Sequence, residues 1–547
     1  MKVWFPLLVS FLLALAATAK YDTHFVILSI QTTDNVTLSA DGMIPKPKTP
    51  GEKFPAVIFP NSWGIPQIEY ITKVLHLADN GYVAIEYETR GWYSSGGEID
   101  TAGPLDRQDT KSVFDYVVSK ADEWNVNVTR IAFCGISYGA GLSLMAAGHI
   151  PQLRTAIAMS GWDRFVDGFY YYKTPAAKEL HGLLDIGKKH GRVPAQLNNF
   201  YDWISTHTNM TAVHHFAHER SPESLYLEDY NTRGTPIFLS NNMLDRLFFP
   251  QTKTHFYSRI TGPKFQLINK GSHAEPEALG IADLGHNYIW EKVFKWMDYW
   301  LKDIDNGIMD EPPIQVQCGT SIAAKNYTKF TAWPDPVKSN PMNLYFTGRG
   351  SAQYGGLQSQ PEPTSVVDTI TYDGQPKLNE GNDKDSSLGF PSQFTFSQDA
   401  PVNSTIVYLS AAFAADTEVC GVPSANLTLS VPSDGNWQIY AFMYDVQNGV
   451  GSIIGDGMYT SWGDSNGEGK APLQATIEKL GSRGGTTQVR ITNLELRVIC
   501  RVIEAGHQFG VAFLLSNPGY TPAATDGLNV GFHYNEDTVF VLPRVVN

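Results

Sequence analysis

The chain has 547 residues, of which 42% are hydrophobic and 18% are charged, and its formal net charge at pH 7 is −14. A chain of this length and composition is expected to form two or three globular domains rather than an intrinsically disordered protein. Because the balance is acidic and no run of basic residues occurs, nucleic acid is not an expected partner.

The first 19 residues have the pattern of a secretory signal peptide. Lys2 supplies a positive charge, the apolar stretch FPLLVSFLLALA follows, and Ala17-Thr18-Ala19 fits the small-x-small cleavage pattern. A membrane anchor is the alternative, but the apolar stretch is short for a span, and no later run of about 20 apolar residues occurs. We therefore expect a protein without a membrane span that is secreted or held in the lumen of the secretory pathway.

Asn-x-Ser/Thr sequons and cysteines are spread along the chain. The possible glycosylation sites are Asn35, Asn127, Asn209, Asn326, Asn403 and Asn426. Cys134 lies in an apolar, strand-like segment and is expected to be a buried free thiol. The remaining cysteines, Cys318, Cys420 and Cys500, allow one disulfide and leave one thiol over, and the sequence does not fix the pairing.

Strand-like and helix-like segments alternate over residues 20–310. Continuous apolar runs predict buried strands, and apolar residues recurring every three or four positions predict amphipathic helices. Strands are expected at 54–60, 82–88, 130–136, 153–161, 235–242 and 264–271, and helices at 70–81, 109–124, 138–148 and 287–303. This alternation predicts a largely parallel sheet covered by helices.

Residues 162–234 interrupt this alternation. The segment is rich in aromatic residues, partly helical and too long for a simple connection, so we expect a cap over the carboxyl edge of the sheet. After residue 310 the pattern changes to many short strand-like runs separated by turn signals such as SDGN and GDSNGEG. Residues 311–547 are therefore expected to form an antiparallel β-sandwich.

Ser137 lies in the motif Gly135-x-Ser137-x-Gly139, between a predicted strand and a helix of small residues. A sharp turn of this kind lifts a serine hydroxyl above a sheet and places a helix N-terminus beside it, where partial positive charge favours an oxyanion. An ordinary glycine-rich turn of a nucleotide-binding fold is the alternative. That alternative is disfavoured because the turn contains neither G-x-G-x-x-G nor G-x-x-x-x-G-K-[ST].

A nucleophilic serine needs a base, and the base needs an orienting acid. Asp245 follows the predicted strand 235–242 and His273 follows the next, so both are expected at the same sheet edge as Ser137. Asp283 and His286 are nearby competitors, but ADLGHNY has the pattern of a helix start rather than of a loop after a strand.

Several segments then resemble the CocE/NonD family of α/β-hydrolases, which includes cocaine esterase, glutaryl-acylase and α-amino-acid ester hydrolase and is related to Xaa-Pro dipeptidyl-peptidases. The resemblance covers nearly the whole mature chain. It is carried by YETRGWYSSGGEID, GISYGA, WMDYWLKDIDNGIMDEPPIQV, IEAGHQFGVAFLLSN and DTVFVLP. It implies an α/β-hydrolase domain with a helical cap insertion at 20–310, followed by an all-β jelly-roll domain at 311–547.

The resemblance also implies roles for individual residues. Ser137 corresponds to the nucleophile, Asp245 to the triad acid and His273 to the general base, and the backbone N–H of Tyr138 corresponds to one oxyanion donor. The second donor of the family is commonly a tyrosine hydroxyl, and Trp63 stands at that turn here. Its indole N–H or its backbone N–H could donate instead. No metal or organic cofactor is implied.

The expected substrate is a small molecule or short peptide with an ester or amide bond, cleaved through an acyl-enzyme on Ser137. An Xaa-Pro dipeptidyl-peptidase is one alternative, and a non-catalytic binding protein of hydrolase fold is another. The related peptidases carry a large extra N-terminal helical region, which favours an esterase or acylase here. Asp163 and Asp167 could meet a substrate ammonium, and the alternative is that they are ordinary surface carboxylates.

The cap aromatics are candidates for lining an acyl pocket or for forming the core of the cap itself. They are Trp162, Phe165, Phe169 and Tyr170 to Tyr172. The sequence does not indicate an oligomeric state.

Overall fold

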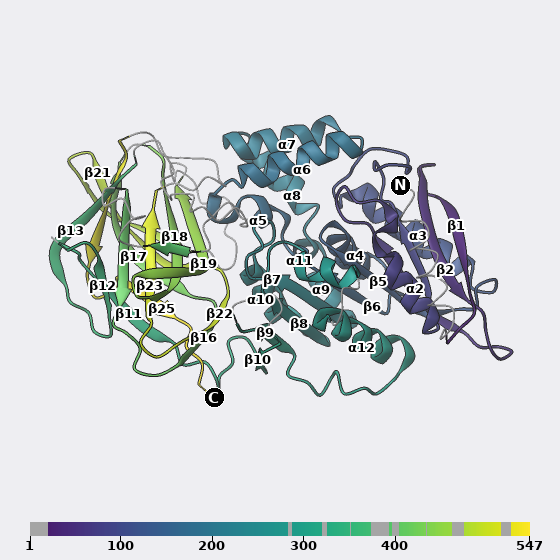
Figure 1. The fold of residues 1–547 in the computed structure, drawn as a ribbon. Helices are drawn as coiled ribbons and strands as arrows, with labels where there is room; N and C mark the ends of the chain where they lie inside the picture. The colour runs from purple at the N-terminus through teal and green to yellow at the C-terminus, as the bar shows by residue number, and fades with distance from the viewer. Residues whose placement is uncertain are drawn as a thin grey trace, which may run out of the picture.

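Two large sheets organise the described part of the molecule, one covered by helices and one folded around its own apolar core, and two further strands form a small third sheet (Figure 1). The computed structural model describes residues 20–282, 287–319, 325–350, 352–372, 393–395, 404–433, 435–461, 475–515 and 527–546. The predicted signal peptide (1–19), the sequon Asn403 and the alternative pair Asp283 and His286 lie outside these residues.

The first sheet has ten strands in the order β1-β2-β4-β3-β5-β6-β7-β8-β9-β10, and neighbours from β4 to β9 are parallel. The strands are β1 (Thr23–Gln31), β2 (Thr37–Pro45), β3 (Phe54–Pro60), β4 (Val83–Tyr87), β5 (Val126–Ile136), β6 (Thr155–Met159), β7 (Ile237–Asn242), β8 (Lys264–Asn269), β9 (Ile314–Gln317) and β10 (Tyr327–Phe330). Central strands such as β3 are buried on both faces, which explains their continuous apolar sequences.

Helices cover both faces of this sheet. They are α2 (Ile71–Asp79), α3 (Pro104–Ser119), α4 (Tyr138–His149), α10 (Pro250–Arg259), α11 (Glu275–Ile281) and α12 (Tyr288–Lys302), with the short η1 (Gln67–Tyr70). Helices α2 and α12 share one core with the sheet, and α3, α4 and α10 share another. The amphipathic stripe of α12 is buried through Trp290, Val293 and Trp296, and burial of the Val293 side chain alone stabilises the fold by about 1.5–3 kcal/mol.

The insertion between β6 and β7 forms the expected helical cap. Its helices are α5 (Phe165–Phe169), η2 (Tyr171–Lys173), α6 (Ala177–His190), α7 (Ala195–Thr206), α8 (Met210–His218) and α9 (Pro222–Arg233). In Figure 1, α6, α7 and α8 lie together at one end of the strands, and one apolar cluster joins cap residues such as Phe200 to Tyr138 of α4. The cap therefore covers the sheet edge from which α4 starts.

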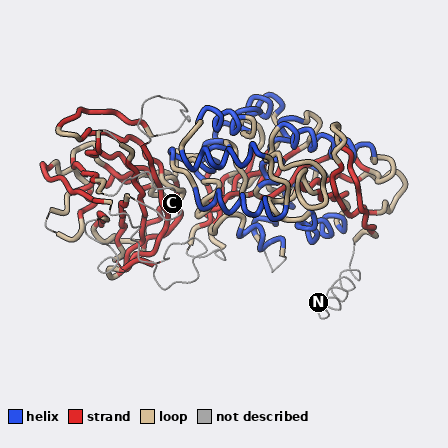
Figure 2. Tube along the Cα trace, turned by 90° about the horizontal axis from the view of Figure 1, so that it is seen from above, coloured by secondary structure: helices blue, strands red, loops and turns tan. Residues whose placement is uncertain are grey.

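From Met342 onward the described residues form strands and loops, which Figure 2 shows as a red and tan body beside the helix-covered domain. Its strands are β11 (Met342–Thr347), β12 (Gly355–Gln358), β13 (Thr364–Thr371), β14 (Gln393–Thr395), β15 (Thr405–Ser410), β16 (Thr417–Gly421), β17 (Ser424–Pro432), β18 (Trp437–Gln447), β19 (Val450–Ser461), β20 (Thr476–Arg483), β21 (Thr486–Glu495), β22 (Ile499–Ile503), β23 (Gln508–Leu514), β24 (Asn529–Tyr534) and β25 (Val539–Leu542). Nearly all described pairs are antiparallel, with β12 and β15 parallel.

The α/β-hydrolase and all-β classes expected from the sequence are confirmed. The change between them falls later than residue 310. Strands β9 and β10 follow that residue but extend the first sheet, since β9 pairs with β8. The second sheet begins with β11 at Met342. The sequence pattern changes at 310 because β9 and β10 are strands of only four residues each, and they follow each other with antiparallel pairing and without a helix between them in the described residues.

Candidate active site

Ser137 lies in a sharp turn between β5 and α4. Its backbone has φ 54° and ψ −113°, a strained combination for a residue that has a Cβ. A Cβ at Gly135 would lie 2.3 Å from the Gly139 carbonyl carbon, and a Cβ at Gly139 would lie 2.3 Å from the Pro60 carbonyl oxygen. Both glycines are therefore required by close backbone approach, and together they hold the serine hydroxyl at the N-terminus of α4.

Asp245 and His273 stand in the loops that follow the neighbouring parallel strands β7 and β8. The Asp245 Oδ1 atom accepts hydrogen bonds from the backbone N–H groups of Leu247 (2.8 Å) and Phe248 (2.9 Å). Its own turn therefore fixes the carboxylate and leaves Oδ2 for a further partner.

The three side chains form one hydrogen-bonded chain. His273 Nδ1 lies 2.8 Å from Asp245 Oδ2, and His273 Nε2 lies 2.8 Å from Ser137 Oγ. Asp245 is fully buried, whereas the His273 side chain is 22% exposed. A buried carboxylate only accepts, so Nδ1 carries the imidazole proton and Nε2 presents a lone pair to the serine hydroxyl. The structure thus brings together the three residues that the sequence analysis selected.

The groups around His273 have opposing effects on its pKa. Burial is the largest single influence and disfavours the imidazolium, but the charge and hydrogen bond of the Asp245 carboxylate together with the charge of Glu277 outweigh it. The pKa of His273 is consequently raised above its usual value.

This shift predicts the acid side of the activity profile. Only neutral His273 can accept a proton, so kcat/KM should fall as the pH drops through a pKa that lies above the usual value of about 6.5. The measurement is kcat/KM for p-nitrophenyl acetate, an uncharged ester, against pH. An acid limb centred below about 6.5 would contradict the prediction.

Glu277, four residues beyond His273, is a site residue that was not predicted from the sequence. Its carboxylate accepts hydrogen bonds from Ser240 Oγ (2.8 Å), Asn242 Nδ2 (2.8 Å) and Ser160 Oγ (3.1 Å), and burial raises its pKa. These partners lie at or just beyond the carboxyl ends of β6 and β7, beneath the triad. None of these residues stands out in the sequence. They come together because β6 and β7 are neighbouring parallel strands.

Trp63 lies beside the Ser137 turn, as expected, but its indole points to the cap. The indole N–H donates to the Leu183 carbonyl of α6 (2.9 Å), and the ring packs edge-on against Trp92 and Tyr138. The backbone N–H of the preceding residue, Ser62, donates to Glu69 (2.7 Å). Two donors of Trp63 were candidates for binding the oxyanion, the indole N–H and the backbone N–H. Because the indole N–H is bonded to Leu183, the backbone N–H remains.

The cap residues considered for substrate contact have structural partners. Asp163 is buried in an ion pair with Lys253, and Asp167 lies 3.5 Å from Arg164. The aromatic residues of the segment are almost fully buried in two apolar clusters, so they form core to a large extent. These residues are Trp162, Phe165, Phe169 and Tyr170 in the cap cluster, and Tyr171 and Tyr172 in the sandwich cluster.

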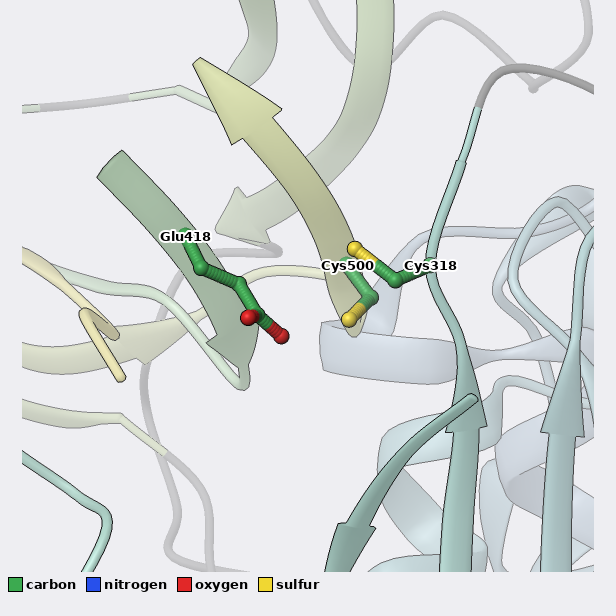
Figure 3. Close-up of side chains that lie close together, drawn as sticks. All are labelled: Cys318, Glu418 and Cys500. Atoms are coloured by element: carbon green, nitrogen blue, oxygen red, sulfur yellow. The ribbon is translucent and has the colours of Figure 1, made fainter. Parts of the chain in front are cut away.

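The four cysteines comprise one disulfide and two free thiols. Cys420 and Cys500 face each other on β16 and β22 and form a disulfide, while Cys134 and Cys318 are buried free thiols. Figure 3 shows Cys318 approaching Cys500 and Glu418 from the segment after β9, with ligand atoms within 4.8 Å of one another. Because the Cys500 sulfur is bonded to Cys420, the group offers fewer donors than the four of a structural zinc site.

Known proteins share both halves of this architecture. Residues 34–275 match the X-Pro dipeptidyl-peptidase (S15 family) domain, and residues 306–526 match the X-Pro dipeptidyl-peptidase C-terminal non-catalytic domain. A Bacillus cereus protein named as a presumed Xaa-Pro dipeptidyl-peptidase is 21% identical over 84% of this chain and 75% of its own length.

Two solved structures share the fold over nearly the whole chain. A CocE/NonD family hydrolase from Staphylococcus aureus has a TM-score of 0.68 at 14% identity, covering 96% of this chain and 94% of its own. An α-amino acid ester hydrolase has a TM-score of 0.64 at 14% identity, covering 96% and 97%.

The fold and the domain matches define a serine hydrolase. More narrowly, the chain contains a domain of the S15 peptidase type followed by a domain of the X-Pro dipeptidyl-peptidase C-terminal type, and it shares the fold of CocE/NonD hydrolases. No helix among the described residues has the length and apolar character needed to span a bilayer.

Proposed function

We propose that this protein hydrolyses a carboxylic ester or amide through an acyl-enzyme on Ser137. The observation that supports the proposal most is the continuous chain from Asp245 through His273 to Ser137, with both contacts at 2.8 Å. Neutral His273 takes the Ser137 proton as the hydroxyl oxygen attacks the substrate carbonyl, and Asp245 stabilises the imidazolium. His273 then protonates the leaving group. In the second half of the reaction, His273 removes a proton from a water molecule as that water attacks the acyl carbonyl, and it returns the proton to the Ser137 oxygen as the acid product leaves.

The tetrahedral oxyanion needs donors near Ser137. The Tyr138 backbone N–H lies at the first position of α4, where helix N–H groups have no internal acceptor. The Trp63 backbone N–H is the second proposed donor, because the indole N–H is already bonded to Leu183. Two main-chain donors of this kind are the usual oxyanion hole of α/β-hydrolases.

Trp63→Phe tests the choice between the two Trp63 donors. The variant keeps the backbone N–H and loses only the indole bond to the cap, so kcat should stay within about fivefold of wild type. Loss of a true oxyanion donor costs about 10²–10³ in kcat. Steady-state hydrolysis of p-nitrophenyl acetate gives the answer, and a loss beyond fiftyfold at nearly unchanged KM would make the indole the donor.

Xaa-Pro dipeptidyl-peptidase activity is the second candidate, supported by the two domain matches at 34–275 and 306–526. Such an enzyme cleaves after proline at the second position and requires a free substrate amine. The substrate test is therefore a panel of p-nitrophenyl esters, β-lactam side-chain amides and Gly-Pro-p-nitroanilide, with succinyl-Gly-Pro-p-nitroanilide as matched control. Rapid cleavage of the free dipeptide alone supports the peptidase, and cleavage of esters alone supports an esterase.

We further propose that the protein is exported and glycosylated. The pattern of residues 1–19 supports export, and the Cys420–Cys500 disulfide fits an oxidising compartment. Among the sequons in the described residues, Asn35, Asn209 and Asn326 are exposed. N-terminal sequencing of secreted protein should begin near residue 20, and treatment with an N-glycosidase should reduce its mass. A product that retains residues 1–19 would contradict export by cleavage.

A further inference from the structure

The β-sandwich reaches the loop that carries the triad acid. Arg497 stands between β21 and β22, and its Nη1 atom donates a 2.7 Å hydrogen bond to the backbone carbonyl of Asp245. Its guanidinium also lies over the Phe249 ring, 4.6 Å from the centroid, in the same loop. In Figure 1, β22 and α10 lie toward the boundary between the two domains. The sandwich therefore holds the loop that ends in α10.

Arg497 is itself held rigidly. The side chain is 2% exposed, Nε lies 2.6 Å from Asp456 Oδ1 on β19, and the Arg497 backbone N–H donates to the Asp456 carbonyl (2.9 Å). A buried guanidinium paired with a carboxylate can donate a strong hydrogen bond without leaving an uncompensated charge. Because the backbone and the guanidinium of Arg497 are both held by Asp456, the position of the sandwich determines where the guanidinium meets Asp245.

The Asp245 residue is thus held at two points. Its carboxylate Oδ1 accepts two N–H groups from its own turn, and its carbonyl accepts from the other domain. Without the second contact, the loop between β7 and α10 would be anchored to its own domain alone. Shifting a catalytic group by about 1 Å can lower a rate about a hundredfold.

We propose that Arg497 is a positioning residue for the triad acid, supplied by the β-sandwich and acting through the Asp245 backbone. The inference rests on the proposed role of the triad and adds a function for the C-terminal domain. Arg497 touches no reacting atom. Its contribution is to keep Asp245 Oδ2 in line with His273 Nδ1.

The test uses the full-length protein and a double variant, Arg497→Met with Asp456→Asn, which removes the donor without leaving a buried unpaired carboxylate. We expect kcat per active site for p-nitrophenyl acetate to fall about tenfold or more, with KM within about twofold. Active sites are counted by fluorophosphonate labelling. The acid limb of kcat/KM should also move to lower pH, because a displaced Asp245 raises the pKa of His273 less.

A matched control separates positioning from simple domain adhesion. Glu495 on β21 pairs with His255 of α10 at 2.7 Å, another contact between the domains that does not touch the Asp245 loop. Glu495→Gln should lower the melting temperature but keep kcat within about twofold and leave the acid limb in place. Arg497→Lys, which keeps a buried cation, should recover part of the lost kcat.

The outcomes are distinct. Wild-type kcat per active site and an unmoved acid limb in the double variant would overturn the proposal. If the double variant does not fold, Arg497→Lys tests the proposal instead. That variant must then lose more than about threefold in kcat, and the acid limb of its kcat/KM profile must move to lower pH. Ser137→Ala is measured in parallel. Activity remaining in that variant would contradict the proposed catalytic triad, whereas an inactive Ser137→Ala would mean that only the role of Arg497 is being tested.

Discussion

Replacing Ser137 with alanine should lower kcat by about four to six orders of magnitude while the protein remains folded. The large effect is expected because no other nucleophile stands in line with His273 Nε2 among the described residues. Folding should survive, since alanine is smaller than serine and the strain at φ 54° is a backbone property shared by both residues. Hydrolysis of p-nitrophenyl acetate and thermal unfolding measure the two quantities.

Ser143→Ala is the matched control for this experiment. Ser143 lies in the same helix, and its hydroxyl donates to the Gly139 carbonyl at 2.7 Å, away from His273. Its removal should leave kcat within a few-fold of wild type. Residual Ser137→Ala activity within tenfold of wild type would show that another residue carries the reaction.

Asp245→Asn should lower kcat by about 10⁴, through the tautomer of His273 rather than through lost packing. The carbonyl oxygen of the new amide would take the place of Oδ1, which accepts from Leu247 and Phe248 N–H. The amide nitrogen would then face His273 Nδ1 and donate to it. The imidazole proton would move to Nε2, where it blocks acceptance of the Ser137 proton.

The pH dependence distinguishes this explanation from misfolding. The Asp245→Asn variant should melt near the wild-type temperature, and its kcat should rise at alkaline pH as hydroxide replaces the missing base. A loss smaller than about tenfold at neutral pH would mean that Asp245 does not orient His273. A variant that melts far below wild type would instead reveal a structural role for the carboxylate.

Much of the catalytic domain followed from local sequence patterns. The predicted strand 54–60 coincides with β3, and the predicted helix 287–303 becomes α12 at 288–302. These elements were predictable because a central parallel strand is apolar on both faces and a surface helix has one apolar stripe. The glycines around Ser137 were equally informative, since only a close turn requires both of them.

The order of Ser137, Asp245 and His273 was also readable, because loops after parallel strands meet at one sheet edge. Contacts between segments that are distant along the chain could not be predicted from the sequence. The sequence left three cysteines without a pairing, and the antiparallel register of β16 and β22 selects Cys420 and Cys500. Similarly, the direction of the Trp63 indole depends on where α6 of the cap places the Leu183 carbonyl.

The sequence by itself determined the two architectures and the turn around Ser137, because each is encoded by neighbours along the chain, and the alternation of strands and helices indicated the sheet edge that Asp245 and His273 share. Only the tertiary structure decided which groups surround them: Glu277 beneath His273, the cap carbonyl on Trp63, and Arg497 on the Asp245 carbonyl. Arg497 is 252 residues from Asp245. Its role depends on how two separately patterned domains pack, and hydrophobic periodicity carries no information about that packing.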